Sequence, residues 1–375
     1  MEFLKNPIFA THAVAAAGSA AFGTTLTHPI DTLKALIQVG TGPSQQLGIA
    51  QVLEKVRSAA GPFGLYSGLG WSTLATVSSL GARFGAYELL TAYCKDGRVD
   101  DYLYVSEAFL SGLAVGPIEA LVSTPFELFK IRAQVTSSSH LSNNTSLRAF
   151  QSTAPTISKL LRGYTPDKTA WEQSIGLLSA LPSKHPDLAN ALKEYPWMMT
   201  GTGRPPFVYE IKGPSNIISL EGWQTLWRGI RSGIARDSIF GGVFFSTWHF
   251  IHIAMLDWKA VDMDPPPRTK EDIGPTSPLA SSLAAGFSGV VAAAASHCFD
   301  TAKTRSQAIV VPKYISMERR LLRWKPLGLW IERFTGLSPA DRKILFRGLW
   351  LRMARSGLAS FSVVGCYYFA VDHLI

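Results

Sequence analysis

Three segments of this chain repeat one spacing of charged and polar residues. They read HPIDTLKALIQ from His28, TPFELFKIRAQ from Thr124 and HCFDTAKTRSQ from His297. Each contains an acid, a lysine three residues later and a glutamine four residues after the lysine. The nine residues are Asp31, Lys34, Gln38, Glu127, Lys130, Gln134, Asp300, Lys303 and Gln307. Such self-similarity is typical of a fold assembled from repeated units, so we expect three equivalent units along the 375 residues.

A second element recurs downstream of each segment. It reads GLYSG, TLWRG and ILFRG, ending at Gly68, Gly229 and Gly348. Eight residues beyond the position before each glycine, the chain has Ala75, Arg236 and Arg355. The interval from acid to glycine is 37, 102 and 48 residues, so the variation in length falls in one loop of each repeat. We therefore predict repeats at 1–100, at 101–256 with an insertion at about 135–220, and at 278–375.

The composition indicates a membrane protein with a polar interior. Charged residues are 17% of the chain, against about 25% in soluble domains. Residues 8–27 carry no Asp, Glu, Lys or Arg, and about 20 helical residues cross a bilayer. We interpret this stretch as a span and not as a cleaved signal. The apolar content of 47% excludes a disordered chain, and three cysteines exclude a disulfide scaffold or zinc finger.

The hydrophobic pattern predicts six transmembrane helices, near 8–38, 69–94, 105–134, 229–256, 278–307 and 349–374. Small residues crowd the first, third and fifth of these, as in Gly112–Gly116 and Ala284–Gly289. Small faces allow helix backbones to approach closely in lipid. The fold class is thus an all-α membrane bundle.

The repeated Pro-x-[Asp/Glu]-x-x-[Lys/Arg] and the later aromatic-[Lys/Arg]-Gly resemble the two halves of the mitochondrial carrier signature. The first copy departs from it, with Ser67 in place of the base. The resemblance implies six transmembrane helices in three pseudo-symmetric repeats, with short helices on the matrix side. It also implies a multi-pass protein of the mitochondrial inner membrane, the alternative being another organelle membrane.

The acid and lysine of each repeat lie on one helix face, because they are three residues apart. A single such pair would be a solvated surface pair, but three copies after uncharged spans point to a buried ring, which avoids the cost of lone charges in lipid. By resemblance the pairs are Asp31–Lys130, Glu127–Lys303 and Asp300–Lys34. They would close the matrix end of a cavity, braced by Gln38, Gln134 and Gln307.

Two positions set expectations for helix shape and for the opposite gate. Pro29 and Pro125 should kink the first and third helices, while Cys298 stands at the equivalent place and the fifth helix should be straighter. At the far end, the family's aromatic-acid-x-x-base motif is mostly lost. It reads Tyr87-Glu88-x-x-Thr91, Trp248-His249-x-x-His252 and Tyr367-Tyr368-x-x-Val371. A weak outer gate fits a uniporter, closure by aromatic packing, or a carrier-like protein that has lost transport.

The substrate would lie at mid-membrane on the even-numbered helices. By resemblance and proximity its contacts are Thr76, Arg83, Arg236, Asp237, Arg355 and Ser356. Arginine suits a carboxylate or phosphate, and Asp237 could meet an ammonium group. We expect an amino-acid-like substrate first, then a carboxylate, then a nucleotide or cofactor. The alternative is that Arg236 and Asp237 pair with each other. Glu119 faces either the cavity or a helix interface. His28 and His297 could bind a metal or relay a proton, but a histidine or a small polar residue is ordinary at these positions in the family, which is the favoured interpretation.

The loops suggest surface contacts. Within the insertion, residues 156–161 and 188–195 have helix-like spacing and could rest on the membrane or on a partner, but simple loop growth is the favoured explanation, because a longer loop costs little. The basic run at 318–325 favours anionic lipids such as cardiolipin over nucleic acid.

No catalytic motif is present, since the chain has no Walker loop, GxSxG or HExxH. We predict no enzyme, metal site or cofactor. The predicted function is transport of a small metabolite by a monomer, by alternating access. The alternative is a carrier-fold scaffold or complex subunit without transport.

Overall fold

Six long helical segments dominate the computed structural model, which describes residues 7–40, 48–96, 103–139, 164–165, 213–261, 263, 273–308, 325–326 and 342–374. The segments are α1 (Pro7–Gly40), α3 (Leu69–Lys95), α4 (Val105–Ser139), α11 (Ile230–Val261), α12 with α13 (Pro278–Ala295 and His297–Ala308), and α17 (Leu349–Leu374). They match the six expected ranges, so the prediction of an all-α membrane fold is confirmed.

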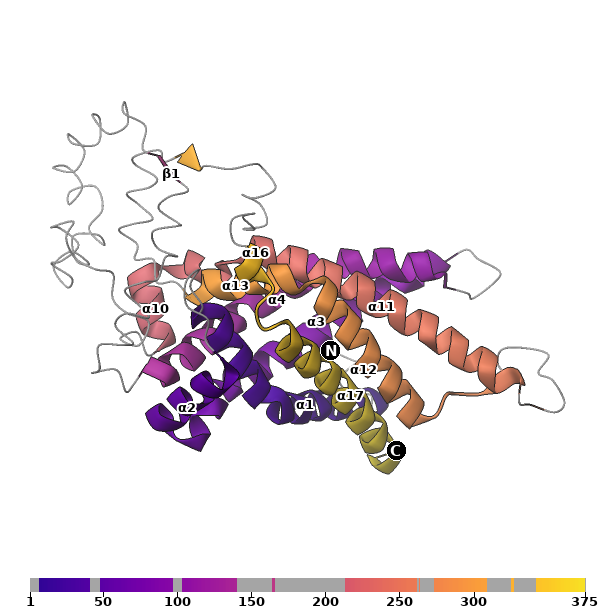
Figure 1. Cartoon of the computed structure of the whole chain (residues 1–375). Coiled ribbons are helices and arrows are strands. Elements are labelled where there is room, and N and C mark those ends of the chain that lie inside the picture. The colour runs from indigo at the N-terminus through magenta and orange to yellow at the C-terminus, as the bar shows by residue number, and fades with distance from the viewer. Residues whose placement is uncertain are drawn as a thin grey trace, which may run out of the picture.

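We call the first, third and fifth segments (α1, α4 and α12 with α13) the odd helices, and the second, fourth and sixth (α3, α11 and α17) the even helices. A short helix follows each odd helix at one end of the bundle (Figure 1). They are α2 (Ile49–Ala60), α10 (Pro214–Glu221) and α16 (Arg342–Leu345), and 3-10 turns follow the first two at Pro62–Tyr66 and Trp223–Trp227. The helix α2 is amphipathic and buries Val52 and Val56 against Leu36 and Ile37 of α1. The expected short helices are thus present. Two-residue strands, β1 (Tyr164–Thr165) and β2 (Lys325–Pro326), pair antiparallel beyond them.

The six segments close into a ring. Each packs on the next in the order α1, α3, α4, α11, α12 and α17, and α17 returns to pack on α1 (Figure 1). The first and last helices therefore seal the bundle, which leaves the inner faces of all six around a common centre.

The repeated glycine lies immediately before each even helix, α3, α11 and α17. Gly68, Gly229 and Gly348 have φ of 79°, 80° and 78°, a left-handed conformation that favours glycine. Each packs on the odd helix of the next repeat, where an added Cβ would lie 3.1 Å from the Lys130 carbonyl oxygen or 3.4 Å from Lys303 Cγ in the first two cases. The turn thereby links each repeat to its neighbour.

Small residues bring α4 and α11 together, as their clustering in the sequence suggests. A Cβ added at Gly112 would collide with the carbonyl group of Gly241, and one at Gly116 would collide with the backbone of Ser238. No larger side chain fits at either crossing point.

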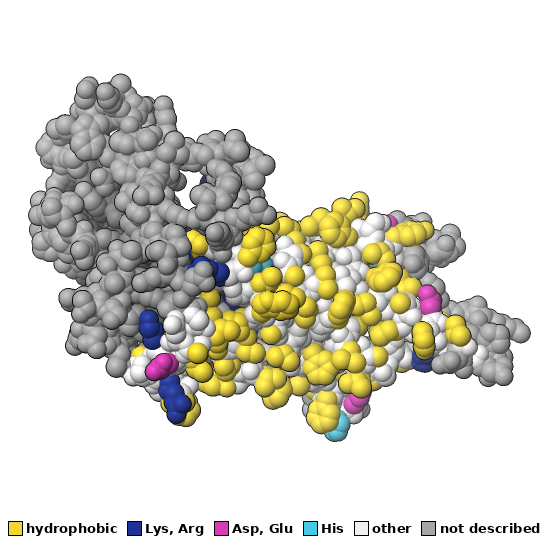
Figure 2. Space-filling view, in the orientation of Figure 1, with side chains coloured by type: hydrophobic (Ala, Val, Ile, Leu, Met, Phe, Trp, Pro, Cys, Tyr) yellow, Lys and Arg dark blue, Asp and Glu magenta, His cyan; other side chains and the backbone are white. Residues whose placement is uncertain are grey.

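Three helical regions of the described part of the chain are long and apolar enough to cross a membrane, at Val105–Thr136, Trp223–Val261 and Pro278–Ala295. The helices α1, α3 and α17 have 34, 27 and 26 residues and are not among these three regions. Their buried sides carry polar residues such as Thr27, Ser72 and Arg352. Apolar side chains cover much of the outer surface of the bundle in Figure 2.

The expectation of a straighter fifth helix is wrong. The helices α1 and α4 run unbroken through Pro29 and Pro125, whereas the fifth segment is interrupted at Ser296, between α12 and α13. At this interruption a side chain from α17, Arg352, bonds to Ser296.

Several expectations fall outside the described residues. Of the insertion at about 135–220, the structure describes 135–139, 164–165 and 213–220. The proposed short helices at 156–161 and 188–195 lie outside this set, as do all but the last residue of the basic run at 318–325.

Candidate functional site

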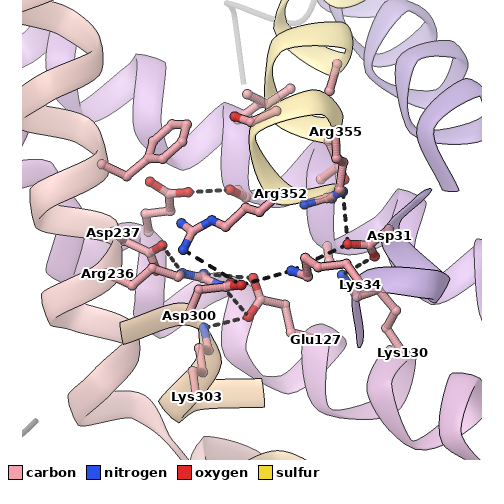
Figure 3. Close-up of a pocket in the computed structure, with 18 of the residues that line it drawn as sticks. Asp31, Lys34, Glu127, Lys130, Arg236, Asp237, Asp300, Lys303, Arg352 and Arg355 are labelled. Atoms are coloured by element: carbon pink, nitrogen blue, oxygen red, sulfur yellow. Dashed lines mark hydrogen bonds and ion pairs between the residues drawn. The ribbon is translucent and has the colours of Figure 1, made fainter. Parts of the chain in front are cut away.

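The acids and lysines of the repeated motif meet inside the bundle (Figure 3). They lie in α1, α4 and α13, the helices that α2, α10 and α16 follow along the chain. Every lysine contacts an acid of another repeat. The three ion pairs are Lys130–Asp31 at 2.9 Å, Lys303–Glu127 at 2.6 Å and Lys34–Asp300 at 3.0 Å. We call these six residues the ion-pair ring. All but Glu127 are buried. An apolar bundle tolerates these buried charges because each is paired with an opposite charge.

Two of the three glutamines brace the ring. Gln38 Nε2 donates to Asp300 Oδ2 and to Thr301 Oγ1, both at 3.1 Å. In the same way, Gln134 Nε2 donates to Asp31 Oδ2 at 3.4 Å and to Thr32 Oγ1 at 3.2 Å.

The third glutamine is bonded differently. Gln307 Nε2 donates to the Thr124 carbonyl at 3.5 Å. The position after the acid is threonine in the first and third repeats but Leu128 in the second, so the hydroxyl acceptor is missing there. The ring is therefore braced unequally.

Arginines from the even helices add a second layer to the ring. Arg355 Nε lies 2.9 Å from Asp31 Oδ1, and an Arg236 nitrogen lies 2.9 Å from Glu127 Oε1. An Arg352 nitrogen lies 3.7 Å from Asp300 Oδ2, a contact that the repeat pattern did not predict. The signal for Arg352 was its place three residues before Arg355, on the same helix face. Each acid of the ring thus has a lysine and an arginine beside it.

Arg236 also pairs with its sequence neighbour. Its Nε donates to Asp237 Oδ1 at 2.6 Å, which is the local pairing weighed as an alternative above. Asp237 is 2% exposed, so its carboxylate is already compensated by Arg236 and does not present a free negative charge.

A cavity of about 190 Å³ lies on top of the ring. Each of the six expected substrate contacts lines it: Thr76, Arg83, Arg236, Asp237, Arg355 and Ser356. Further lining residues that the sequence analysis did not propose as contacts are Ser79, Glu119, Phe240, Phe244, Arg352 and Ser360. The even helices supply most of them, which places the cavity among the side chains expected from the repeat spacing.

Glu119 faces the cavity and also bridges two helices. Arg83 Nε donates to Glu119 Oε2 at 2.8 Å, and Ser79 Oγ donates to Glu119 Oε1 at 2.6 Å. The Arg83 guanidinium lies 4.7 Å from the ring centre of Phe240, a cation–π distance. Both alternatives for Glu119 are therefore realised in one side chain.

The charges around the cavity do not balance. Seven lysines and arginines and five acids line it, an excess of two positive charges. Inside an apolar bundle such an excess favours an anionic ligand, because low dielectric strengthens the attraction.

The opposite end of the even helices is aromatic. Tyr87 stacks on Phe245 with ring centres 3.6 Å apart, and Trp248 stacks on His252 at 5.1 Å. His12 Nδ1 and Tyr367 Oη are hydrogen-bonded at 3.0 Å, joining α1 to α17. Among the described residues, no ion pair joins the even helices at this end, in line with the reduced motif there.

His28 and His297 are each hydrogen-bonded to a backbone carbonyl. Their Nε2 atoms are hydrogen-bonded to the carbonyls of Ser67 at 3.0 Å and Arg347 at 3.2 Å. Each histidine thus ties an odd helix to the turn before the following even helix.

Comparison with known proteins matches residues 5–97 to the family model described as "Mitochondrial carrier protein". A probable mitochondrial 2-oxoglutarate/malate carrier of Dictyostelium discoideum is 35% identical over 112 residues, 29% of this chain and 34% of the relative. The mitochondrial dicarboxylate/tricarboxylate transporter of Arabidopsis thaliana is 31% identical over 116 residues, 31% and 37% of the two chains.

A mitochondrial adenyl nucleotide antiporter of Homo sapiens is 30% identical over 121 residues, 32% of this chain and 25% of the relative. The matched part spans between a quarter and about a third of these relatives' own length.

Proposed function

We propose that this chain is a divergent member of the mitochondrial carrier family and that it moves a small dicarboxylate across the mitochondrial inner membrane by alternating access. The observation that carries this proposal is the excess of two positive charges around the cavity. A dicarboxylate would neutralise that excess, whereas a zwitterionic amino acid would leave it in place. Two of the relatives are named as carriers of dicarboxylates.

The state of Asp237 separates the two leading substrate classes. An amino acid needs an acid for its ammonium group, but Asp237 is bonded by Arg236 at 2.6 Å and 3.0 Å. Glu119 is likewise bonded by Arg83. Both cavity acids outside the ring are therefore satisfied, which favours the carboxylate over the amino-acid-like substrate.

The volume of the cavity favours a small solute. A pocket for a drug-sized ligand measures roughly 300–1,000 Å³, and this cavity measures about 190 Å³. Thr76 and Ser356 supply hydroxyl groups on two helices that line it. A nucleotide would need the ring to open before it fitted, while a four- or five-carbon diacid would not.

The ion-pair ring acts as the matrix gate in this proposal. Lysine–acid pairs between repeats hold the odd helices together, so they must separate before solute leaves on that side. Arg236 and Arg355 are shared between the gate acids and the cavity. A bound dicarboxylate competes with Glu127 and Asp31 for these guanidinium groups, and by linkage its binding weakens the gate by the same free energy with which the gate weakens binding.

Uptake into proteoliposomes tests the proposal. Purified protein should accumulate labelled malate or 2-oxoglutarate above protein-free vesicles, and aspartate or ATP much less. Arg355→Ala should remove most of this uptake, while Arg231→Ala, on the exposed side of α11, should leave it intact. If aspartate is taken up in preference to both diacids, the dicarboxylate proposal is wrong and the substrate belongs to the amino-acid class.

A carrier-fold scaffold without transport is the second candidate. The aromatic outer end, which lacks ion pairs between even helices among the described residues, favours it. Folded protein that takes up none of these solutes, and whose melting temperature shifts with none of them, would replace the transporter by this scaffold.

A further inference from the structure

The fifth transmembrane segment is broken where the other odd segments are not. Its first part, α12, ends at Ala295, and Ser296 follows with φ −99° and ψ 9° before α13 begins at His297. Sharp interruptions of a helix arise at proline, at glycine and serine pairs, at π-bulges, or where a side chain or water inserts into the backbone hydrogen-bond ladder. Residues 279–308 contain no proline. At the break, Ser296 Oγ donates to the Ala292 carbonyl at 2.8 Å, and a side chain from another helix also reaches Ser296.

Arg352 of α17 is that side chain. One terminal nitrogen of its guanidinium group donates to the Ser296 carbonyl at 2.8 Å, and the other donates to Ser296 Oγ at 2.7 Å. The helical donor to the same carbonyl, Asp300 N, is farther away at 3.3 Å. Arg352 is 5% exposed and Ser296 is fully buried, so water does not compete for these bonds.

Proline and arginine are distributed in a complementary way over the three repeats. Arg352 stands four residues after the turn glycine Gly348, and the equivalent positions are Ser72 and Gly233, neither of which is long enough to reach the neighbouring odd helix. Those two repeats have Pro29 and Pro125, while the third has Cys298. The arginine occurs only in the repeat that lacks the proline.

The break lies one turn before the ring. Asp300 follows Ser296 by four residues and bonds Lys34 Nζ at 3.0 Å, and an Arg352 nitrogen lies 3.7 Å from the same Asp300 oxygen. The direction in which α13 leaves Ser296 therefore decides whether Asp300 reaches α1.

We propose that Arg352 is a positioning residue of the gate: by bonding Ser296 it sets the break between α12 and α13 and so holds Asp300 against Lys34, in place of the missing proline. This inference concerns the geometry of the ring and holds whether or not the chain carries a solute. Its test therefore uses no transport measurement.

Cross-linking of cysteine pairs tests the position of α13. In full-length protein carrying Cys94→Ser, Cys298→Ala and Cys366→Ser, the reporter pair is Gln38→Cys with Thr301→Cys, whose native side chains are 3.1 Å apart. The reference pair is Thr32→Cys with Gln134→Cys, 3.2 Å apart between α1 and α4. A short bifunctional thiol reagent should link both pairs efficiently in lipid vesicles.

Arg352→Met should lower the yield at the reporter pair several-fold and leave the reference pair unchanged. Placing proline at position 298 in the Arg352→Met protein should restore the reporter yield, because proline breaks the helix without the arginine. Arg352→Lys, which keeps the charge but loses the two-pronged donor, should restore it only in part.

Three results would overturn the inference. In the first, Arg352→Met leaves the reporter yield unchanged. In the second, the yield falls and stays low with proline at 298, which would assign the effect to the charge of Arg352 and not to the helix break. If Arg352→Met lowers both pairs, Arg352→Gln is measured instead, and loss at both pairs there too would make Arg352 a general stability residue.

Discussion

Arg355 Nε lies 2.9 Å from Asp31 Oδ1, so an arginine at a substrate-contact position is also a partner of a gate acid. The two residues come from the last and the first transmembrane helices, which pack together and close the bundle. Any anion that draws Arg355 away removes one of the cations that compensate Asp31, so Arg355, like Arg236, links the cavity to the ring.

The first prediction concerns the pair between Asp31 and Lys130. Asp31→Lys should abolish uptake, because it sets a third lysine beside Lys34 and Lys130 in a buried site. Adding Lys130→Asp should recover a measurable part of the activity. Recovery should stay incomplete, because Lys34 and Arg355 also contact Asp31.

The matched control for this swap is Lys130→Asp alone, which should be as inactive as Asp31→Lys. If neither this swap nor the corresponding Glu127/Lys303 and Asp300/Lys34 swaps gains activity over its single variants, then the residues do not act as a ring of pairs.

The second prediction ranks the glutamines by thermal unfolding. Gln38→Leu should destabilise the protein by about 2 kcal/mol, since it removes two bonds, one to a carboxylate. Gln307→Leu removes one long bond to a carbonyl and should cost no more than about 1 kcal/mol. Equal losses for the two variants would contradict the unequal bracing.

The third prediction concerns the crossing of α4 and α11. Gly112→Val should destabilise the fold by more than about 3 kcal/mol, because its side chain meets the Gly241 carbonyl and overpacking of a tight contact is costly. Gly81→Val is the control, since nothing lies within 4 Å of a Cβ there. Yield and melting temperature of purified protein report both, and a folded Gly112→Val protein with normal stability would refute the close approach.

The fourth prediction concerns a buried acid at the end of α10. Glu221 lies 2.9 Å from an Arg132 nitrogen on α4 and also pairs with Arg228. Glu221→Gln should cost about 3–5 kcal/mol, because breaking a buried ion pair leaves an uncompensated charge. The double variant Glu221→Gln with Arg132→Met should be more stable than the single one, and the opposite order in urea unfolding would argue against the pairing.

The hydrophobic pattern predicted the six helices, the repeat spacing picked out the residues that form the ring, and the family resemblance implied their pairing and the short helices at one end. That information is local, since the acid, lysine and glutamine share one helix face wherever the helix lies. The threefold repetition then limits how three such faces can meet. The same offsets placed Arg236, Asp237 and Arg355 at the cavity, where the structure finds them.

Only the tertiary structure decided which groups compensate which charges. The spacing could not tell that Arg236 bonds Asp237 and Glu127, that Arg355 reaches Asp31, or that Gln307 finds a carbonyl instead of a gate acid. With Cys298 in place of proline, the sequence predicted a straighter fifth helix, and it could not show that Arg352, 56 residues away along the chain, would bond Ser296 at the break. Helix formation follows from neighbouring residues, whereas ion pairs and helix breaks in a bundle depend on which side chains other helices bring into reach.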